Sequence, residues 1–387
     1  MFLAVYLTVF IGIHALFFFR IRVLFMDKGI IQWAVILFLT VMLLVPMASY
    51  MLERNGQELL ARIAAFIGFC WVGFIFLAFA ACVCMSLFDL AAWGTNALLR
   101  IIPGIRLSIP LLSGKAAALA MVVTVSLFCI YGVIEARSIR VEQLDITTDK
   151  LPPDASPLTI AQISDVHLGL IIGGGFLEKI IDRLESVEPD ILVCTGDLVD
   201  SSLSNLLNLA EQINRLQPRY GKYAVTGNHE YYAGLDQSLS FLERSGFTVL
   251  RGESRTPGEL INIAGVDDSD RSGARRSDGS AGASQALQAL SGTNNGRFTL
   301  FLKHRPAVTA DSLGHFDLQL SGHTHRGQMF PFSYLVKRQF PLMDGLHDLG
   351  KNAKLYINRG TGTWGPPMRI FSPPEITVIR LTRPEGG

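Results

Sequence analysis

Long stretches without a charged side chain are the first feature of this 387-residue sequence. Four apolar stretches, at about 2–19, 30–52, 63–87 and 116–135, contain no Lys, Arg, Asp or Glu in their interior, and Glu135 stands only at the end of the last one. Each has about the 17–25 residues that a helix needs to cross a bilayer. Because one soluble core rarely contains four such stretches in sequence, we predict a membrane domain of four transmembrane helices over residues 1–140.

The first stretch lacks the features of a cleaved signal peptide. No basic segment precedes it and no small-residue cleavage site follows it, so we interpret it as a retained span. The four stretches also lack the internal acidic or basic residues that ion and substrate pathways usually need. This absence argues against a small transporter or channel with a regulatory domain.

Neither face of the predicted membrane domain has a large excess of basic residues. An even number of spans places the N-terminus and the C-terminal part of the chain on the same side. Six basic residues flank the opposite face and five flank the face of the C-terminal part: Arg20, Arg22, Lys28, Arg100, Arg106 and Lys115 against Arg54, Arg62, Arg137, Arg140 and Lys150. Cytoplasmic flanks carry the excess of Lys and Arg. The sequence therefore favours a multi-pass protein of the cell membrane with an extracytoplasmic C-terminal domain.

Cysteine is scarce outside the apolar stretches. Of the five cysteines only Cys194 lies in the C-terminal part, which excludes an internal disulfide there. The sequence also lacks internal repeats and a phosphate-binding loop, because the glycine run at 173–175 has no GK[ST] or GxGxxG frame. The 24 basic and 28 acidic residues after position 140 are typical of an ordinary soluble domain, long enough to bury a full core.

Strand and helix patterns alternate after a predicted linker at 141–157. Apolar runs typical of buried strands begin at 158, 191 and 222, and helical spacing occupies 176–190 and 203–216 between them. Further strand-like runs follow at 261–268, 298–306, 317–325, 354–360 and 375–381. This βαβαβ pattern with a strand-rich second half predicts an α/β domain over 158–383, with buried sheets and helices outside.

The first of these strands ends in a carboxylate and an imidazole. In the stretch AQISDVHLGL, Asp165 and His167 stand two residues apart. On an extended segment residues i and i+2 point the same way, so both side chains are expected to aim at one point. The pair alone is compatible with three interpretations: a metal site, a hydrogen bond between the two side chains, or no functional role.

Polar side chains of the same kind follow the other strands. GDLVD supplies Asp197, GNHE supplies Asn228 and His229, KHRP supplies His304, and GHTHRGQ supplies His323 and His325. A single histidine is usually structural, but open α/β sheets place their sites at the carboxyl ends of strands. Five such fragments in order favour a shared metal site. Mixed histidine and carboxylate ligands suit Mn²⁺, Fe or Zn²⁺ better than Ca²⁺.

The ordered motifs D-x-H, G-D-x-x-D, G-N-H-E, H and G-H-x-H resemble those of the calcineurin-like metallophosphoesterase superfamily. The residues in and around these motifs are most similar to the YkuE-like membrane-associated phosphodiesterase branch of that superfamily. The resemblance covers about residues 155–383. It implies a four-layer α/β/β/α sandwich. It also implies a hydrolase that uses a dinuclear centre of two divalent metal ions to activate a water molecule.

By this resemblance, Asp165, His167, Asp197 and His325 would hold one metal ion, and Asp197, Asn228, His304 and His323 the other. Asp197 would bridge them, since a carboxylate has two oxygens. His229 would be catalytic, either as the general acid for the leaving oxygen or by stabilising charge on the phosphate. The alternative is a residue that only orients Asn228 or a metal ligand. Arg326 stands where relatives often have a small residue, so we expect it to bind the substrate phosphate, with a solvent-facing role as the alternative.

The combined prediction is a membrane-anchored dimetal phosphohydrolase that cleaves phosphoester or pyrophosphate bonds. Because the spans hold the site near the bilayer, the expected substrate is a lipid or a lipid-linked envelope precursor, and we expect no nucleic acid partner. The alternative is a catalytically silent membrane scaffold or regulatory protein that retains the fold. A silent protein is expected to have lost ligands, and no predicted ligand is missing.

Overall fold

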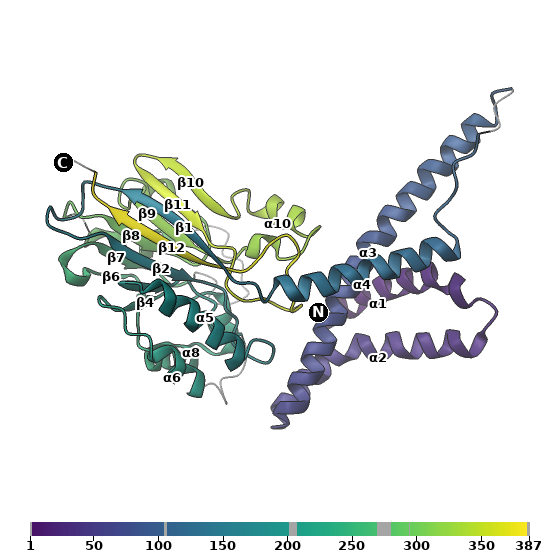
Figure 1. Ribbon diagram of the computed structural model, residues 1–387, viewed down its shortest axis with the longest axis horizontal. Coiled ribbons are helices and arrows are strands. Elements are labelled where there is room, and N and C mark those ends of the chain that lie inside the picture. Colours follow the sequence, from purple (N-terminus) through teal and green to yellow (C-terminus); the bar gives the residue numbers. More distant parts are fainter. Residues whose placement is uncertain (1, 104–106, 201–206, 269–279, 294, 385–387) are drawn as a thin grey trace. The chain divides into compact units, whose positions relative to one another are not determined.

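The computed structural model describes residues 2–103, 107–200, 207–268, 280–293 and 295–384 (Figure 1). It divides the chain into two compact units. The first comprises Met1–Ile134 with Gly365–Met368, and the second comprises Glu135–Trp364 with Arg369–Gly387. All the predicted ligands belong to the second unit.

Long helices make up the first unit. They are α1 (Phe2–Ile21), α2 (Gly29–Arg54), α3 (Glu58–Leu99) and α4 (Lys115–Glu135), with a short 3₁₀ turn η1 (Arg22–Phe25) after α1. All four α-helices are long and apolar enough to cross a membrane, and they match the four predicted spans. His14 is satisfied inside this unit, because its Nδ1 lies 2.7 Å from the Phe10 carbonyl oxygen and the Trp71 indole donates to its Nε2 at 2.9 Å.

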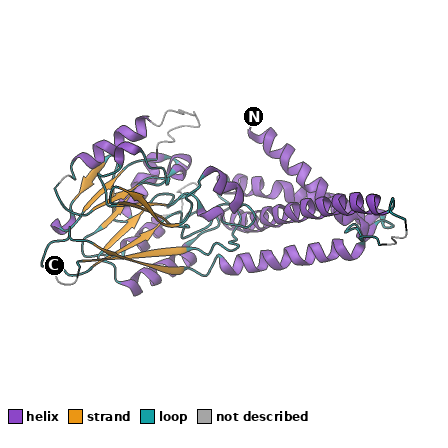
Figure 2. Ribbon diagram, turned by 90° about the horizontal axis from the view of Figure 1, so that it is seen from above, coloured by secondary structure: helices purple, strands orange, loops and turns teal. Residues whose placement is uncertain are grey.

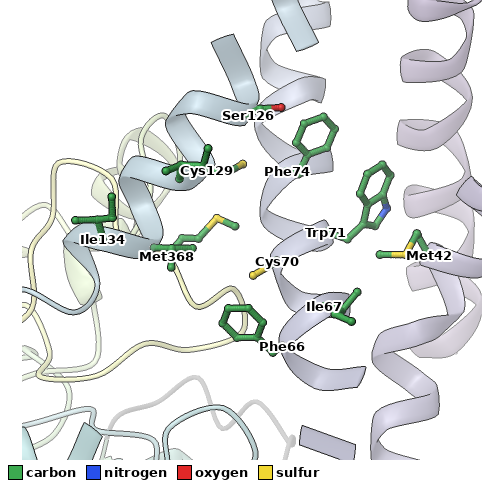
Figure 3. A pocket seen from close by; sticks show the side chains of 12 residues that line it. Met42, Phe66, Ile67, Cys70, Trp71, Phe74, Ser126, Cys129, Ile134 and Met368 are labelled. Atoms are coloured by element: carbon green, nitrogen blue, oxygen red, sulfur yellow. The ribbon is translucent and has the colours of Figure 1, made fainter. Parts of the chain in front are cut away.

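An apolar cavity of about 580 Å³ lies within the first unit. Trp71, Phe74, Cys129 and Met368 are among the side chains that line it (Figure 3). Met368 reaches this unit as part of the Gly365–Met368 segment.

Two six-stranded sheets form the centre of the second unit (Figure 2). The first runs in the order β1 (Arg140–Thr147), β12 (Glu375–Thr382), β2 (Leu158–Ile163), β3 (Ile191–Cys194), β4 (Lys222–Ala224) and β5 (Phe247–Val249). The second runs in the order β10 (Gly345–Gly350), β11 (Ala353–Ile357), β9 (Leu318–Ser321), β8 (Thr299–Leu302), β7 (Asn262–Gly265) and β6 (Glu253–Arg255). In both sheets the strands that carry predicted ligands pair in parallel, so their carboxyl ends lie at the same edge.

Three apolar layers hold the sheets and helices together. The helices α5 (Gly174–Val187), α6 (Leu207–Asn214) and α8 (Leu235–Arg244) bury their apolar faces against one side of the first sheet. Alternate strand residues such as Ile160 and Leu320 fill the space between the two sheets. The helix α9 (Ser280–Ser291) covers the outer side of the second sheet. This arrangement is the predicted α/β/β/α sandwich.

Several elements differ from the sequence prediction. The predicted linker at 141–157 begins inside β1, which pairs in parallel with β12 over eight residues from Arg140↔Glu375 to Thr147↔Thr382. The GNHE motif, expected at a strand end, instead begins the helix α7 (Asn228–Ala233). The remaining elements are α10 (Ser333–Gln339) and the short 3₁₀ turns η2 (Pro257–Glu259), η3 (Ala310–Ser312) and η4 (His325–Gly327).

Candidate metal centre

The predicted ligands converge at the carboxyl ends of strands from both sheets. Asp165 and His167 follow β2, Asp197 follows β3, Asn228 begins α7 after β4, His304 follows β8, and His323 and His325 follow β9. Six of these seven residues are buried and His323 is half-buried. The structure thus brings together residues up to 160 positions apart in the sequence.

Left-handed backbone at the ligands makes this convergence possible. Asp165, His167, Asp197, His323 and His325 have φ between 48° and 71°, a region that L-residues rarely adopt because it costs about 1 kcal/mol or more each. Asp165 and His167 therefore do not lie on an extended segment, and the expected i, i+2 geometry was wrong although both side chains reach the site. Backbone hydrogen bonds at 3.0 Å, from Asp165 to Gly196 and from His167 to Asp197, hold the two loops together.

One group of ligand atoms gathers around His325. Its Nε2 lies 3.1 Å from His167 Nε2 and 3.5 Å from Asp165 Oδ1. The three residues offer atoms that all lie within 4.8 Å of one another, a spacing that could hold one metal ion. Both Asp165 oxygens accept the backbone N–H of His323 at 3.0 Å, which fixes the carboxylate in place.

A second group gathers around His304. Its Nε2 lies 3.2 Å from Asp197 Oδ2 and 3.1 Å from His323 Nδ1, and these three residues also have the spacing of a metal site. The same Asp197 oxygen lies 3.9 Å from His167 Nε2 in the first group. The Asp197 carboxylate therefore stands between the two groups, where a bridging ligand would stand.

The donor chemistry fits a pair of divalent metal ions. His304 Nδ1 lies 2.8 Å from the Thr195 carbonyl oxygen, so Nδ1 carries a proton, and Nε2 is the nitrogen that would bind a metal once its own proton is displaced. Asn228 Oδ1 is buried and has no hydrogen-bond partner among the described residues. A buried amide oxygen without a donor is unfavourable by itself, and a cation would satisfy it.

The charges of the cluster depend on one another. Burial by itself would raise the pKa of Asp197, but the imidazoles of His304, His167 and His229 outweigh it and hold that pKa well below its usual range. Burial would lower the pKa of His304, yet Asp197 and Asp165 raise it to about 10. Burial and the neighbouring cation of His304 lower the pKa of His323 to about 2. His323 is thus neutral, as a ligand must be, whereas a metal would displace a proton from His304.

His229 lies beside the ligands and next to a carboxylate that sequence reasoning did not assign to the site. Its Nδ1 lies 2.7 Å from Asp200 Oδ1, and the same oxygen lies 3.4 Å from His167 Nδ1. Burial would lower the pKa of His229, but Asp200 and Asp197 raise it above the usual range, which favours the protonated form. Asp200 ends the G-D-x-x-D motif, so its position in that motif was the available signal.

Glu230 is a second residue whose role the sequence did not reveal. It is fully buried, and its Oε2 accepts the backbone N–H groups of Gly227 at 2.6 Å and Asp197 at 2.9 Å. Its Oε1 accepts those of Leu198 at 2.8 Å and Val199 at 3.2 Å. One carboxylate therefore joins the loop that carries Asp197 to the start of α7. Gly227 makes this contact possible, because a Cβ there would overlap the Asp197 carboxylate.

Arg369 is a third such residue, and it has no recognisable motif. It is fully buried, and its Nη2 lies 3.1 Å from His325 Nδ1. Its guanidinium also donates to backbone carbonyl oxygens of His325, Arg359, Gly360, Gly362 and Ser372. Burial lowers the pKa of Arg369 to about 10, so the group stays charged at neutral pH and fixes the His325 ring.

Arg326 follows His325 directly and also has left-handed backbone. Its side chain is 38 % exposed, and its Nε lies 3.1 Å from Asp344 Oδ2. Two aromatic rings lie near His229: those of Tyr232 and Trp364, with centroids 5.2 and 6.0 Å away. Both residues are more than half exposed. The Arg326 side chain is accessible to a substrate, but it already pairs with Asp344. The phosphate contact expected of Arg326 therefore stays a prediction.

The sequence is similar to those of known proteins. Residues 158–327 match the family model described as calcineurin-like phosphoesterase. An uncharacterized metallophosphoesterase of Aquifex aeolicus is 40% identical over 252 residues, 65% of this chain and 95% of that protein. A transmembrane protein with metallophosphoesterase domain from Danio rerio is 33% identical over 70% of this chain and 63% of its own length. The uncharacterized metallophosphoesterase YkuE of Bacillus subtilis is 28% identical over 64% of this chain and 87% of its own length.

The matched region includes the loops that carry all seven predicted ligands. The resemblance inferred from the motifs is therefore confirmed, including its YkuE-like relatives. This chain belongs to the calcineurin-like phosphoesterase family.

Proposed function

We propose that the protein is a membrane-anchored phosphohydrolase that cleaves phosphoester or pyrophosphate bonds at a two-metal site. The main support is the position of the Asp197 carboxylate, whose Oδ2 lies 3.2 Å from His304 Nε2 and 3.9 Å from His167 Nε2. A single carboxylate between two separate ligand groups is the arrangement expected of a ligand that bridges two cations. Membership in the phosphoesterase family supplies the reaction class.

The side chains divide into holding and proton-transfer roles. Asp165, His167 and His325 would hold one ion with Asp197, and Asn228, His304 and His323 would hold the other. When bound, two divalent cations (Mn²⁺, Fe or Zn²⁺) would neutralise the phosphate oxygens and lower the pKa of a water molecule. His229, kept protonated by Asp200, would give its proton to the leaving oxygen.

Metal content and turnover of the same preparation test this proposal. The detergent-purified full chain is stripped with a chelator, reloaded with Mn²⁺, Fe²⁺ or Zn²⁺, and assayed on phosphomonoesters, phosphodiesters and lipid pyrophosphates. We expect two metal equivalents and turnover that requires them. Asp197→Asn is expected to lose both ions, whereas Asp236→Asn, at an exposed position of α8, keeps them. Two full equivalents in Asp197→Asn refute the bridging role, and two equivalents without turnover on any ester favour the silent scaffold.

The proposed substrate class is a phosphate carried by a lipid or lipid-linked envelope precursor. The support is the presence of four helices long and apolar enough to span a membrane, which an enzyme for soluble nucleotides would not need. We further propose that the catalytic domain faces the extracytoplasmic side, as the flanking charges favour. Labelling of Asp236→Cys by an impermeant thiol reagent in intact cells tests the side, and absence of labelling before lysis overturns it. If the full chain cleaves water-soluble esters far better than any lipid phosphate in mixed micelles, the substrate class is wrong.

A further inference from the structure

We propose that an exposed surface on the catalytic domain, formed by Phe330, Tyr334, Leu335, Lys337 and Arg338, binds the head-group region of the bilayer. We call it the α10 surface. Membrane contact by this surface does not depend on the proposed function, whereas its consequence for the substrate does.

Large apolar side chains are accessible on this surface although the domain has well-filled cores. Tyr334 and Leu335 are 68 % and 67 % exposed, and Phe330 is 44 % exposed. The Phe330 and Tyr334 rings lie 5.8 Å apart, so they form one patch instead of scattered single residues. Exposed apolar side chains that cluster in this way mark a contact with a membrane or another molecule.

The polar part of the surface matches lipid head groups. Lys337 and Arg338 are exposed in the last turn of α10. The stretch from 329 to 343 contains no Asp or Glu, so these two positive charges are not neutralised within it. Aromatic and leucine side chains beside basic residues are the composition of helices that lie in the membrane interface. Basic residues near the surface are attracted by anionic lipids.

The chain connection favours a bilayer over a protein as the partner. The last long apolar helix, α4, ends at Glu135, and β1 of the catalytic domain begins at Arg140. Only four residues separate them, so the domain remains within reach of the lipid surface whenever α4 spans the membrane. An apolar and basic patch on a domain that is tethered in this way meets lipid head groups at a high effective concentration.

The α10 surface is also fixed to the candidate metal centre. The turn η4, which begins at His325, leads through Gly327 toward α10. A Cβ at Gly327 would overlap the backbone of Ser333, so the start of α10 packs directly on this turn. Contact of α10 with head groups would therefore hold the metal centre near the depth of lipid phosphates. This consequence rests on the proposed phosphohydrolase function.

Spin-label accessibility in the reconstituted full chain tests the contact. A single cysteine replaces Leu335 in a chain whose five native cysteines have been substituted, and the matched control places it at Asp348, an exposed residue of β10 in the same domain. The chain is reconstituted in vesicles of phosphatidylcholine with a minority of phosphatidylglycerol. We expect the label at 335 to collide more with oxygen and less with a water-soluble nickel chelate than the label at 348.

Two results would overturn the proposal. Equal nickel accessibility at 335 and 348 means that the surface faces water. Low accessibility of the label at 335 to both reagents means that protein covers it, either a second copy or the helices of the same chain. An unfolding temperature of each labelled chain equal to that of the unlabelled parent confirms that the fold is intact.

A charge variant links the surface to the substrate. In Lys337→Gln/Arg338→Gln we expect the ratio of lipid-phosphate to soluble-ester turnover to fall by about 25-fold, because each of the two basic residues contributes about fivefold to binding of an anionic surface. An unchanged ratio overturns this role of the charges. If the parent protein cleaves neither substrate, the proposed function fails while the spin-label result still decides the membrane contact.

Discussion

Glu230 offers the sharpest test of how the candidate metal centre is held in shape. The substitution Glu230→Gln keeps the size of the side chain but replaces one carboxylate oxygen by an NH₂ group. Each oxygen accepts two backbone N–H groups, Gly227 and Asp197 on one side and Leu198 and Val199 on the other. In either orientation the new NH₂ group faces two donors. Two hydrogen bonds to a charged group are lost.

The expected loss of stability follows from these bonds. A hydrogen bond to a charged group contributes about 1.5–3 kcal/mol, so two of them give about 3–6 kcal/mol. Burial raises the pKa of Glu230, so the carboxylate itself is destabilised, and the neutral amide avoids part of that cost. We therefore expect the loss of stability to lie at the lower end of this range, at about 3 kcal/mol. For a domain of this size that corresponds to a decrease of about 6–12 °C in unfolding temperature.

Thermal unfolding and metal analysis of the detergent-purified chain measure both consequences. Glu230→Gln is expected to unfold at lower temperature and to retain less metal, because the loop of Asp197 loses its connection to α7. Glu178→Gln is the matched control, since its carboxylate pairs with Arg215 at 2.9 Å on the surface. Exposed pairs contribute little, so the control is expected to behave like the parent. An unfolding temperature and metal content of Glu230→Gln equal to those of the control would refute the reasoning.

Three further predictions concern other buried groups. His229→Ala is expected to keep its metals and to lose about 10²–10⁴-fold activity on an alkyl ester but much less on a nitrophenyl ester, whose phenolate leaves without a proton; equal losses, or loss of metal, would make His229 structural. Arg369→Lys keeps the charge but not the planar donors, so we expect one metal equivalent instead of two because His325 loses its support, and two full equivalents would contradict this. Burial lowers the pKa of Lys222 from 10.5 to about 8 in the folded chain. Between about pH 8 and 10.5 the unfolded chain therefore binds more protons than the folded chain, and the free energy of unfolding rises with pH. Lys222→Met should therefore raise the unfolding temperature at pH 7 and lose this advantage as the pH approaches 10.5; an equal gain at both pH values contradicts the assignment.

The sequence predicted the fold where burial is continuous. The runs that became β2, β3, β8 and β9 are rich in apolar residues, because nearly every position of these strands is buried. The edge strand β1 could not be predicted in this way, since most of its residues are exposed or half-buried and its pairing with β12 joins residues more than 230 positions apart. The exposed strand β10 was missed for the same reason.

The site was predictable to the extent that its residues stand in compact motifs. Asp165 and His323 each stand two residues after the end of a strand, so their grouping could be inferred from sheet topology. The backbone at these positions could not, because left-handed conformations of Asp and His have no sequence signal comparable to glycine. Arg369 lies 44 residues beyond His325 and reaches it only through the folded loop, so no spacing pattern could reveal the contact.

The unfavourable features of the candidate metal centre explain why its supporting residues are charged and buried. Five ligands with left-handed backbone cost on the order of 5 kcal/mol together, and the crowded imidazoles and carboxylates add electrostatic strain. Glu230 and Arg369 offset part of this cost, because each satisfies several backbone groups of the ligand loops with one buried charge. Neither residue contacts the orphaned Asn228 oxygen, and a cation among the ligands would satisfy it. Metal binding is therefore expected to stabilise the domain that carries the ligands, since the same cations satisfy the groups that the fold holds in unfavourable positions.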